Sequence, residues 1–88
     1  MKTLHSNQEL YDYMLSLMST LKKRGADVLS ETVDFARNQA SGLSTEFLGE
    51  SRIALRRVAN QEGNVLTEEE RTDLLDVLRQ LDEALDKR

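Results

Sequence analysis

Hydrophobic residues recur at intervals of three and four positions along nearly the whole chain, which is the spacing of one face of an α-helix. No segment shows the strict alternation of apolar and polar residues that is typical of a half-buried strand. Proline, which interrupts helices, is absent from the 88 residues. The pattern therefore predicts an all-α protein, and we divide it into four helical segments that form a single helical domain over residues 1–88.

The first predicted helix begins at Ser6, whose hydroxyl can cap it, and Glu9 three residues later completes a capping box. Gly25 is placed to end this helix in the left-handed conformation that glycine adopts readily. Between these signals, apolar residues mark the inner face: Leu10, Met14, Leu17 and Leu21.

The second predicted helix follows directly, with Asp27 as its expected cap. Its inner face repeats the same spacing, and two further apolar residues widen it: Leu29, Val33, Ala36 and Ala40, with Val28 and Phe35. One glycine costs only about 1 kcal/mol inside a helix, so a continuous helix from Ser6 to Ala40 is the alternative, giving three helices with a long first one. We favour the break, because basic residues followed by Gly25 and then Asp27 signal a helix end and a helix start.

Ser44 is the expected cap of the third helix, with Leu43 and Leu48 placed as a hydrophobic staple. Thr67 and Glu70 form a second capping box at the start of the fourth helix. The inner faces of these two helices are Phe47, Leu48, Ala54, Leu55, Val58 and Ala59, followed by Leu74, Leu78, Leu81 and Leu85. Because all the connections are short, we expect a compact bundle of four short antiparallel helices.

Composition narrows the environment in which this domain is expected. The formal charge is −4, and there is no cysteine, so neither a disulfide framework nor a thiolate metal site is expected. No apolar run approaches the roughly 20 residues that span a bilayer. Lys2 is not followed by the apolar segment of a signal peptide. We therefore expect a cytoplasmic protein that does not associate with a membrane.

The residues that most catalytic sites require are missing. The only histidine is His5, ahead of the first helix, so no base is placed beside a nucleophile. No cluster of histidines has metal-ligand spacing, and no glycine-rich nucleotide loop is present. The carboxylates of the last helix have no evident reason for a raised pKa. We expect no catalytic residue, no metal, no cofactor and no small-molecule substrate.

The first helix carries more apolar surface than one neighbour can cover. Its apolar residues span roughly 200° of the helix: Leu10, Tyr11, Tyr13, Met14, Leu15, Leu17, Met18 and Leu21. Either the helix is central and contacts two neighbours, or Tyr11, Leu15 and Met18 form a second face for a partner or a second copy. Methionine and tyrosine suit such surfaces, since one is adaptable and the other amphipathic.

Ile53 projects away from the main apolar stripe of the third helix, on the side of Gly49. A single exposed isoleucine is common and carries no functional meaning by itself. The alternative is that Ile53 contacts a partner, with Gly49 allowing another helix to approach closely. The candidate partner-binding residues are thus Tyr11, Leu15, Met18 and Ile53.

The charges favour a hairpin of the last two helices. Eight carboxylates lie on the fourth helix, and we expect the arginines of the third helix to face them: Arg52, Arg56 and Arg57. An alternative is that these arginines bind nucleic acid together with a basic cluster that ends the first helix: Lys22, Lys23 and Arg24. The overall acidity of the chain opposes that alternative, because phosphate contacts dominate nucleic-acid affinity.

These observations favour a non-catalytic protein–protein interaction module, with a homodimer as one such assembly. The predicted binding surface is the wide apolar face of the first helix or the acidic face of the fourth. Two alternatives stay open: a nucleic-acid-binding protein that uses the basic faces, and an accessory subunit of an enzyme.

Overall fold

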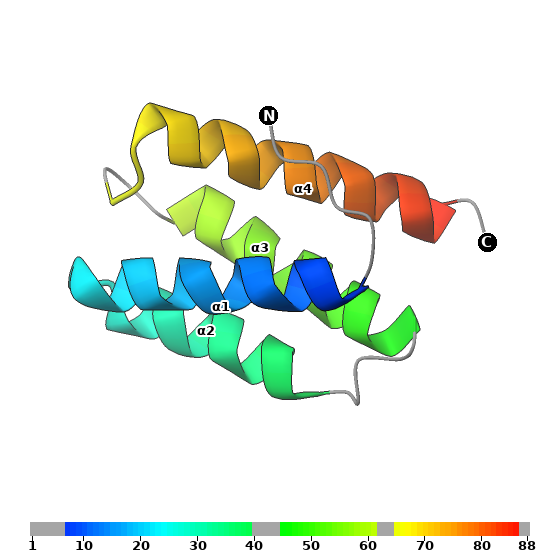
Figure 1. Cartoon of the computed structure of the whole chain (residues 1–88), viewed down its shortest axis with the longest axis horizontal. Helices are drawn as coiled ribbons and strands as arrows, with labels where there is room; N and C mark the ends of the chain where they lie inside the picture. Colours follow the sequence, from blue (N-terminus) through cyan, green and yellow to red (C-terminus); the bar gives the residue numbers. More distant parts are fainter. Residues whose placement is uncertain (1–6, 40–44, 62–64, 87–88) are drawn as a thin grey trace.

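A computed structural model describes residues 7–39, 45–61 and 65–86, and within these ranges the chain forms four helices and no strand. The helices are α1 (Asn7–Lys23), α2 (Asp27–Gln39), α3 (Thr45–Gln61) and α4 (Glu68–Asp86). Consecutive helices run in opposite directions, and α1 packs on α2, α2 on α3 and α3 on α4 (Figure 1). The predicted all-α bundle of four helices is therefore confirmed, and it measures 35 × 24 × 19 Å.

The break between α1 and α2 decides between four helices and three. Gly25 has a φ of 83°, in the left-handed region. The Gly25 N–H donates to the Lys22 carbonyl (3.1 Å) and the Ala26 N–H to the Leu21 carbonyl (2.9 Å). This pair of bonds is a Schellman motif, which satisfies carbonyls that the helix end leaves free. The continuous-helix alternative is excluded, and Asp27 is the first residue of α2 rather than its cap.

The predicted capping box at the start of α4 is confirmed. The Thr67 N–H donates to Glu70 Oε1 (2.9 Å), and the Glu70 N–H donates to the Thr67 hydroxyl (3.1 Å). Arg24, at the end of α1, donates both to this Glu70 carboxylate and to the Val65 carbonyl. The Arg24 guanidinium, followed by the Thr67 N–H, lowers the pKa of Glu70 to about 2. Four other predicted positions lie outside the described residues: the caps Ser6 and Ser44, the staple residue Leu43 and the inner-face residue Ala40.

The core lies between the four helices and contains most of the predicted inner positions. Its buried apolar residues are Leu10, Met14, Leu17, Leu21, Leu29, Val33, Ala36, Phe47, Ala54, Leu55, Val58, Leu66, Leu74, Val77, Leu78 and Leu81. The prediction that Val28 and Phe35 widen the inner face of α2 is wrong, because they are 73% and 64% exposed. Each lies about 100° around the helix from its core neighbour, Leu29 or Ala36, and so points away from the core.

Candidate functional site

Five large apolar side chains in the described part of the chain are exposed to solvent. They are distributed over all four helices: Leu15, Val28, Phe35, Ile53 and Leu75. Scattered apolar side chains are normal on a protein surface, whereas apolar side chains that meet at one concave place indicate a binding site. Two residues of this set, Phe35 and Ile53, line one groove together.

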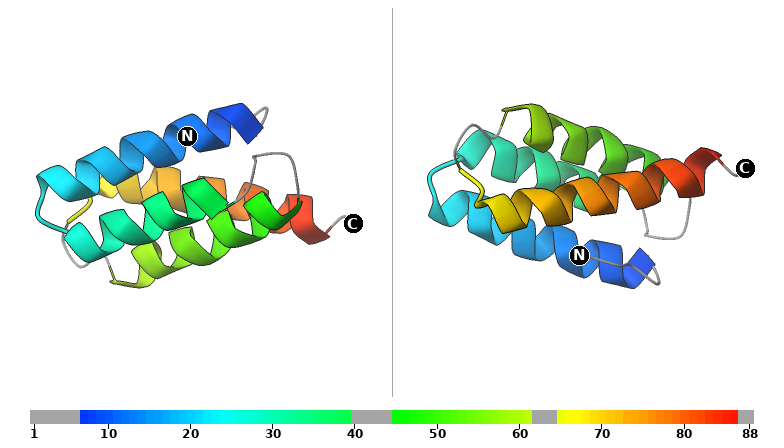
Figure 2. Two further views of the ribbon diagram at one scale, coloured as in Figure 1. Left: turned by 90° about the horizontal axis from the view of Figure 1, so that it is seen from below. Right: turned by 90° about the horizontal axis from the view of Figure 1, so that it is seen from above.

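That groove has a volume of about 130 Å³ and lies between α2 and α3. The two helices lie side by side in the view from below (Figure 2, left). Ala36 and Ala54 are buried, and they share the groove with the exposed Phe35 and Ile53. Short alanine side chains next to large exposed ones leave a depression with apolar walls. We define the α2–α3 groove by its lining residues on α2 and on α3. On α2 these are Thr32, Phe35 and Ala36, and on α3 they are Glu50, Ile53, Ala54 and Arg57.

Opposite charges lie on the α3 wall of the groove, on either side of Ile53. Glu50 precedes Ile53 by three residues and Arg57 follows it by four, so all three lie on one face of α3. Glu50 is half-buried and Arg57 is exposed. Within the described residues neither side chain forms an ion pair. The α2–α3 groove therefore combines an apolar centre with two charges available to a ligand.

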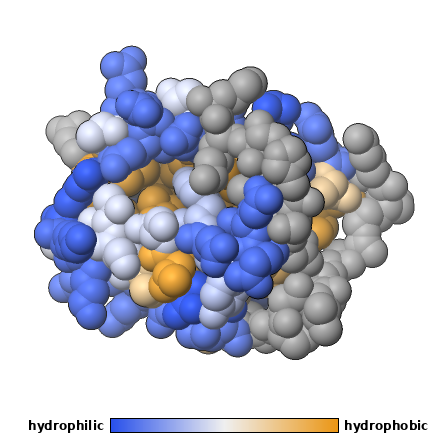
Figure 3. Space-filling view, in the orientation of Figure 1, coloured by the Kyte–Doolittle hydropathy of each residue, from blue (hydrophilic) through white to orange (hydrophobic). Residues whose placement is uncertain are grey.

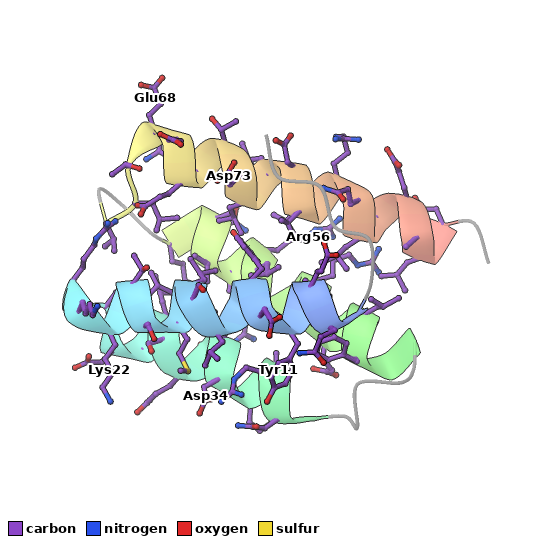
Figure 4. The ribbon with its side chains drawn as sticks, in the orientation of Figure 1. Tyr11, Lys22, Asp34, Arg56, Glu68 and Asp73 are labelled. Carbon is purple, nitrogen blue, oxygen red and sulfur yellow. The ribbon has the colours of Figure 1, made fainter. Side chains whose placement is uncertain are left out.

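The other two arginines of α3 have a different arrangement. Arg52 Nη1 and Arg56 Nη2 both donate to Asp82 Oδ1 of α4, at 3.3 and 2.7 Å. The labelled Arg56 side chain lies between α3 and α4 (Figure 4). The predicted pairing of arginines with the acidic neighbour thus holds for Arg52 and Arg56, but Arg57 lines the α2–α3 groove instead.

Tyr11, a predicted partner-binding residue, is held by contacts within the protein. Its hydroxyl accepts a hydrogen bond from Arg37 Nη1 (2.5 Å), and Arg37 Nη2 donates to Asp34 Oδ1 (2.7 Å). The guanidinium carbon lies 5.0 Å from the centroid of the Tyr11 ring, within cation–π range. The same ring lies 6.4 Å from the ring of Phe47. Tyr11 and Asp34 are seen on the same side of the molecule in Figure 4.

The two other predicted residues of α1 differ from each other. Met18 is half-buried against the core, and its carbonyl accepts a hydrogen bond from the Ser30 hydroxyl of α2 (3.0 Å). Leu15 is 41% exposed. Figure 3 looks onto α1 and shows mostly hydrophilic residues on the coloured surface, with small hydrophobic areas between them. These contacts favour the interpretation that the apolar face of α1 is wide because it packs against more than one neighbouring element. Partner binding by this face stays a prediction.

A larger and more polar cleft, of about 500 Å³, lies between α1 and α2. Its lining is mainly charged: Met18, Lys22, Asp27, Ser30, Glu31 and Asp34. The three carboxylates follow one another along two turns of α2. Within residues 7–39, 45–61 and 65–86, no three acidic or histidine side chains are grouped so that they could hold a metal ion.

A third pocket, of about 150 Å³, lies between α1 and α4. Tyr13 lines it together with Glu70 and Asp73. Burial, and then the negative charges of Asp73 and Glu70, raise the pKa of Tyr13 above its ordinary value. These effects favour the protonated phenol, which can form hydrogen bonds.

Ile53, a candidate partner-binding residue in the sequence, lines the groove, and so does the larger Phe35, which the sequence pattern instead assigned to the inner face of α2. A signal was present: Val28, Thr32 and Phe35 repeat the four–three spacing of the core stripe, shifted by one residue. Two adjacent stripes on a short helix can be one wide buried face or one buried and one exposed face. The position of the neighbouring helices decides which of these two arrangements forms, and that position cannot be read from the sequence.

Among the described helices, none is both long and apolar enough to cross a membrane. Comparison of the chain with protein families, with characterised proteins and with solved structures gives no match.

Proposed function

We propose that this protein is a non-catalytic protein–protein interaction module that binds through the α2–α3 groove. The observation that carries the proposal is the meeting of two exposed apolar side chains, Phe35 and Ile53, in a groove that also holds two charges with no ion pair among the described residues. Apolar centres with polar rims are the usual composition of protein interfaces.

Phe35 is the expected anchor of the interface. A phenylalanine side chain can bury about 150–250 Å², so its 64% exposed fraction leaves roughly 100–160 Å² for a partner to cover. At about 25 cal/mol per Å², covering that area stabilises a complex by at most about 2.5–4 kcal/mol. This is the range of an interface hot spot, where truncation of one side chain weakens binding more than tenfold.

Ion pairs made by three of the candidate nucleic-acid-binding arginines weigh against the nucleic-acid alternative. Arg24 is paired with Glu70, and both Arg52 and Arg56 are paired with Asp82. A phosphate backbone would have to compete with these carboxylates for each guanidinium. An accessory subunit of an enzyme would use a protein-binding groove in the same way, so the identity of the partner distinguishes that case.

Photo-crosslinking in cells tests the proposal. A benzoylphenylalanine replaces Phe35 in one variant, and in a matched control it replaces Leu75, which is similarly exposed but lies on α4. We expect covalent adducts to a specific protein from position 35 and none from position 75. Phe35→Ser should then weaken direct binding of the identified partner at least tenfold, while Leu75→Ser leaves it unchanged. Equal labelling from both positions, or none from position 35, would contradict the assignment.

A further inference from the structure

We propose, on the basis of the function just proposed, that the occupant of the α2–α3 groove is a second copy of this chain. In this arrangement α3 of one copy packs antiparallel against α3 of the other, with a two-fold axis passing close to Ile53. Phe35 of each copy then flanks the α3 of its partner. Such an interface is isologous, since the same patch is contributed by both chains.

The order of charges along α3 is the first argument. Glu50 and Arg57 are seven residues apart, about 10 Å along the helix axis and nearly on one face. In an antiparallel pair centred between Ile53 and Ala54, the residue order is reversed, so Glu50 of each copy lies opposite Arg57 of the other. Two equivalent ion pairs form, one on each side of the apolar centre. A parallel pairing would instead place Glu50 beside Glu50, which is repulsive.

The second argument is that both charges are available. Arg52 and Arg56 are occupied by Asp82 of α4. Within the described residues, no ion pair involves Glu50 or Arg57, although both line the groove beside Ile53. Charges that have no partner in the described part of the monomer and that are complementary under a two-fold rotation favour a second copy over an unrelated partner.

The third argument is steric. In the part of the chain that the structure describes, nothing but the adjacent residues and backbone of α3 itself lies within 4 Å of the position that a Cβ at Gly49 would occupy, so this side of α3 is open. Gly49 lies one turn before Ile53, on the same side of the helix. A helix of a second copy can therefore approach the α3 backbone more closely here than next to a larger residue.

Charge reversal combined with mixing tests this arrangement. The variants are Glu50→Arg, Arg57→Glu and the double variant that carries both substitutions. Light scattering on a size-exclusion column measures dimerisation over a dilution series from about 1 mM to about 1 µM, the range in which small interfaces dissociate. Circular dichroism checks that each variant remains helical. Glu31→Arg, on the α1 side of α2, is the matched control, since it reverses a charge outside the groove.

We expect the wild-type protein to dimerise and each single reversal to weaken dimerisation at least tenfold, because both symmetric ion pairs become repulsive. The double variant should dimerise as the wild type does, and so should an equimolar mixture of the two single variants, in which every pair is again complementary. The control should behave as the wild type. A monomeric wild type, unchanged single variants, or no recovery in the mixture would each overturn the proposal. If position 35 nevertheless crosslinks to a different protein, the proposed interaction function holds. In that case only the proposal that a second copy occupies the groove is refuted.

Discussion

A buried hydroxyl in the middle of α3 should destabilise the protein, and its removal should make the protein more stable. Ser51 is 0% exposed, and its Oγ has no hydrogen-bond partner among the described residues. It lies on the core stripe of α3, between Phe47 and Leu55, which are also fully buried. A hydroxyl that loses its water and gains no partner costs about 1–3 kcal/mol.

The substitution Ser51→Ala removes only this oxygen. Alanine also favours the helix over serine by about 0.5 kcal/mol. The small void left by one oxygen costs only about 0.3 kcal/mol. We therefore expect the free energy of unfolding to rise by about 1–3 kcal/mol, which for a domain of this size corresponds to an increase in Tm of about 4–24 °C.

Ser30 of α2 provides the matched control, because it is also buried but its hydroxyl donates to the Met18 carbonyl (3.0 Å). Ser30→Ala gains the same helix propensity and loses a hydrogen bond worth about 1 kcal/mol, so its net effect is neutral or slightly destabilising. Urea unfolding followed by far-UV circular dichroism, at one protein concentration, measures both variants. The reasoning is refuted if Ser51→Ala is no more stable than the wild type, or if Ser30→Ala gains as much.

Two further predictions concern the glycines and the contact between α1 and α4. At concentrations where the protein is monomeric, Gly49→Ala should raise stability by about 0.5–1 kcal/mol, because alanine favours the helix interior and its Cβ enters space that is open in the single chain. Gly25→Ala should lower stability by about 1–2 kcal/mol, because φ is 83° there; thermal melts in which both variants shift in the same direction would contradict this pair. Glu70→Gln keeps a side chain that can cap α4 but removes its charge next to Arg24. The folded-state pKa of Glu70 is lowered to about 2, so its ionic contribution is complete above pH 4.5 and is lost as the pH falls toward 2. The Tm difference between wild type and variant should therefore shrink over that range, whereas a constant difference would show that the charge contributes nothing.

The helices and their ends could be read from the sequence because their causes are local. The capping box of Thr67 and Glu70 and the left-handed Gly25 each depend on residues within one or two turns. The core stripes also follow directly from the spacing of apolar residues. For the same reason the sequence favours four helices over the alternative of a continuous first helix, since a glycine after basic residues is a local stop signal.

The surface was decided by the tertiary structure. Val28 and Phe35 have the same apolar character and spacing as core residues, yet they are exposed because α1 and α3 cover only one stripe of α2. The sequence does not distinguish Arg57 from Arg52 and Arg56. Because of where α4 lies, Asp82 forms ion pairs with Arg52 and Arg56, whereas Arg57 lines the α2–α3 groove. The sequence alone determined which segments are helical and which face of each is most apolar. Only the tertiary structure decided which of the remaining apolar and charged residues meet at one surface. The reason is that such meetings depend on the angles between the packed helices and on which helices are neighbours.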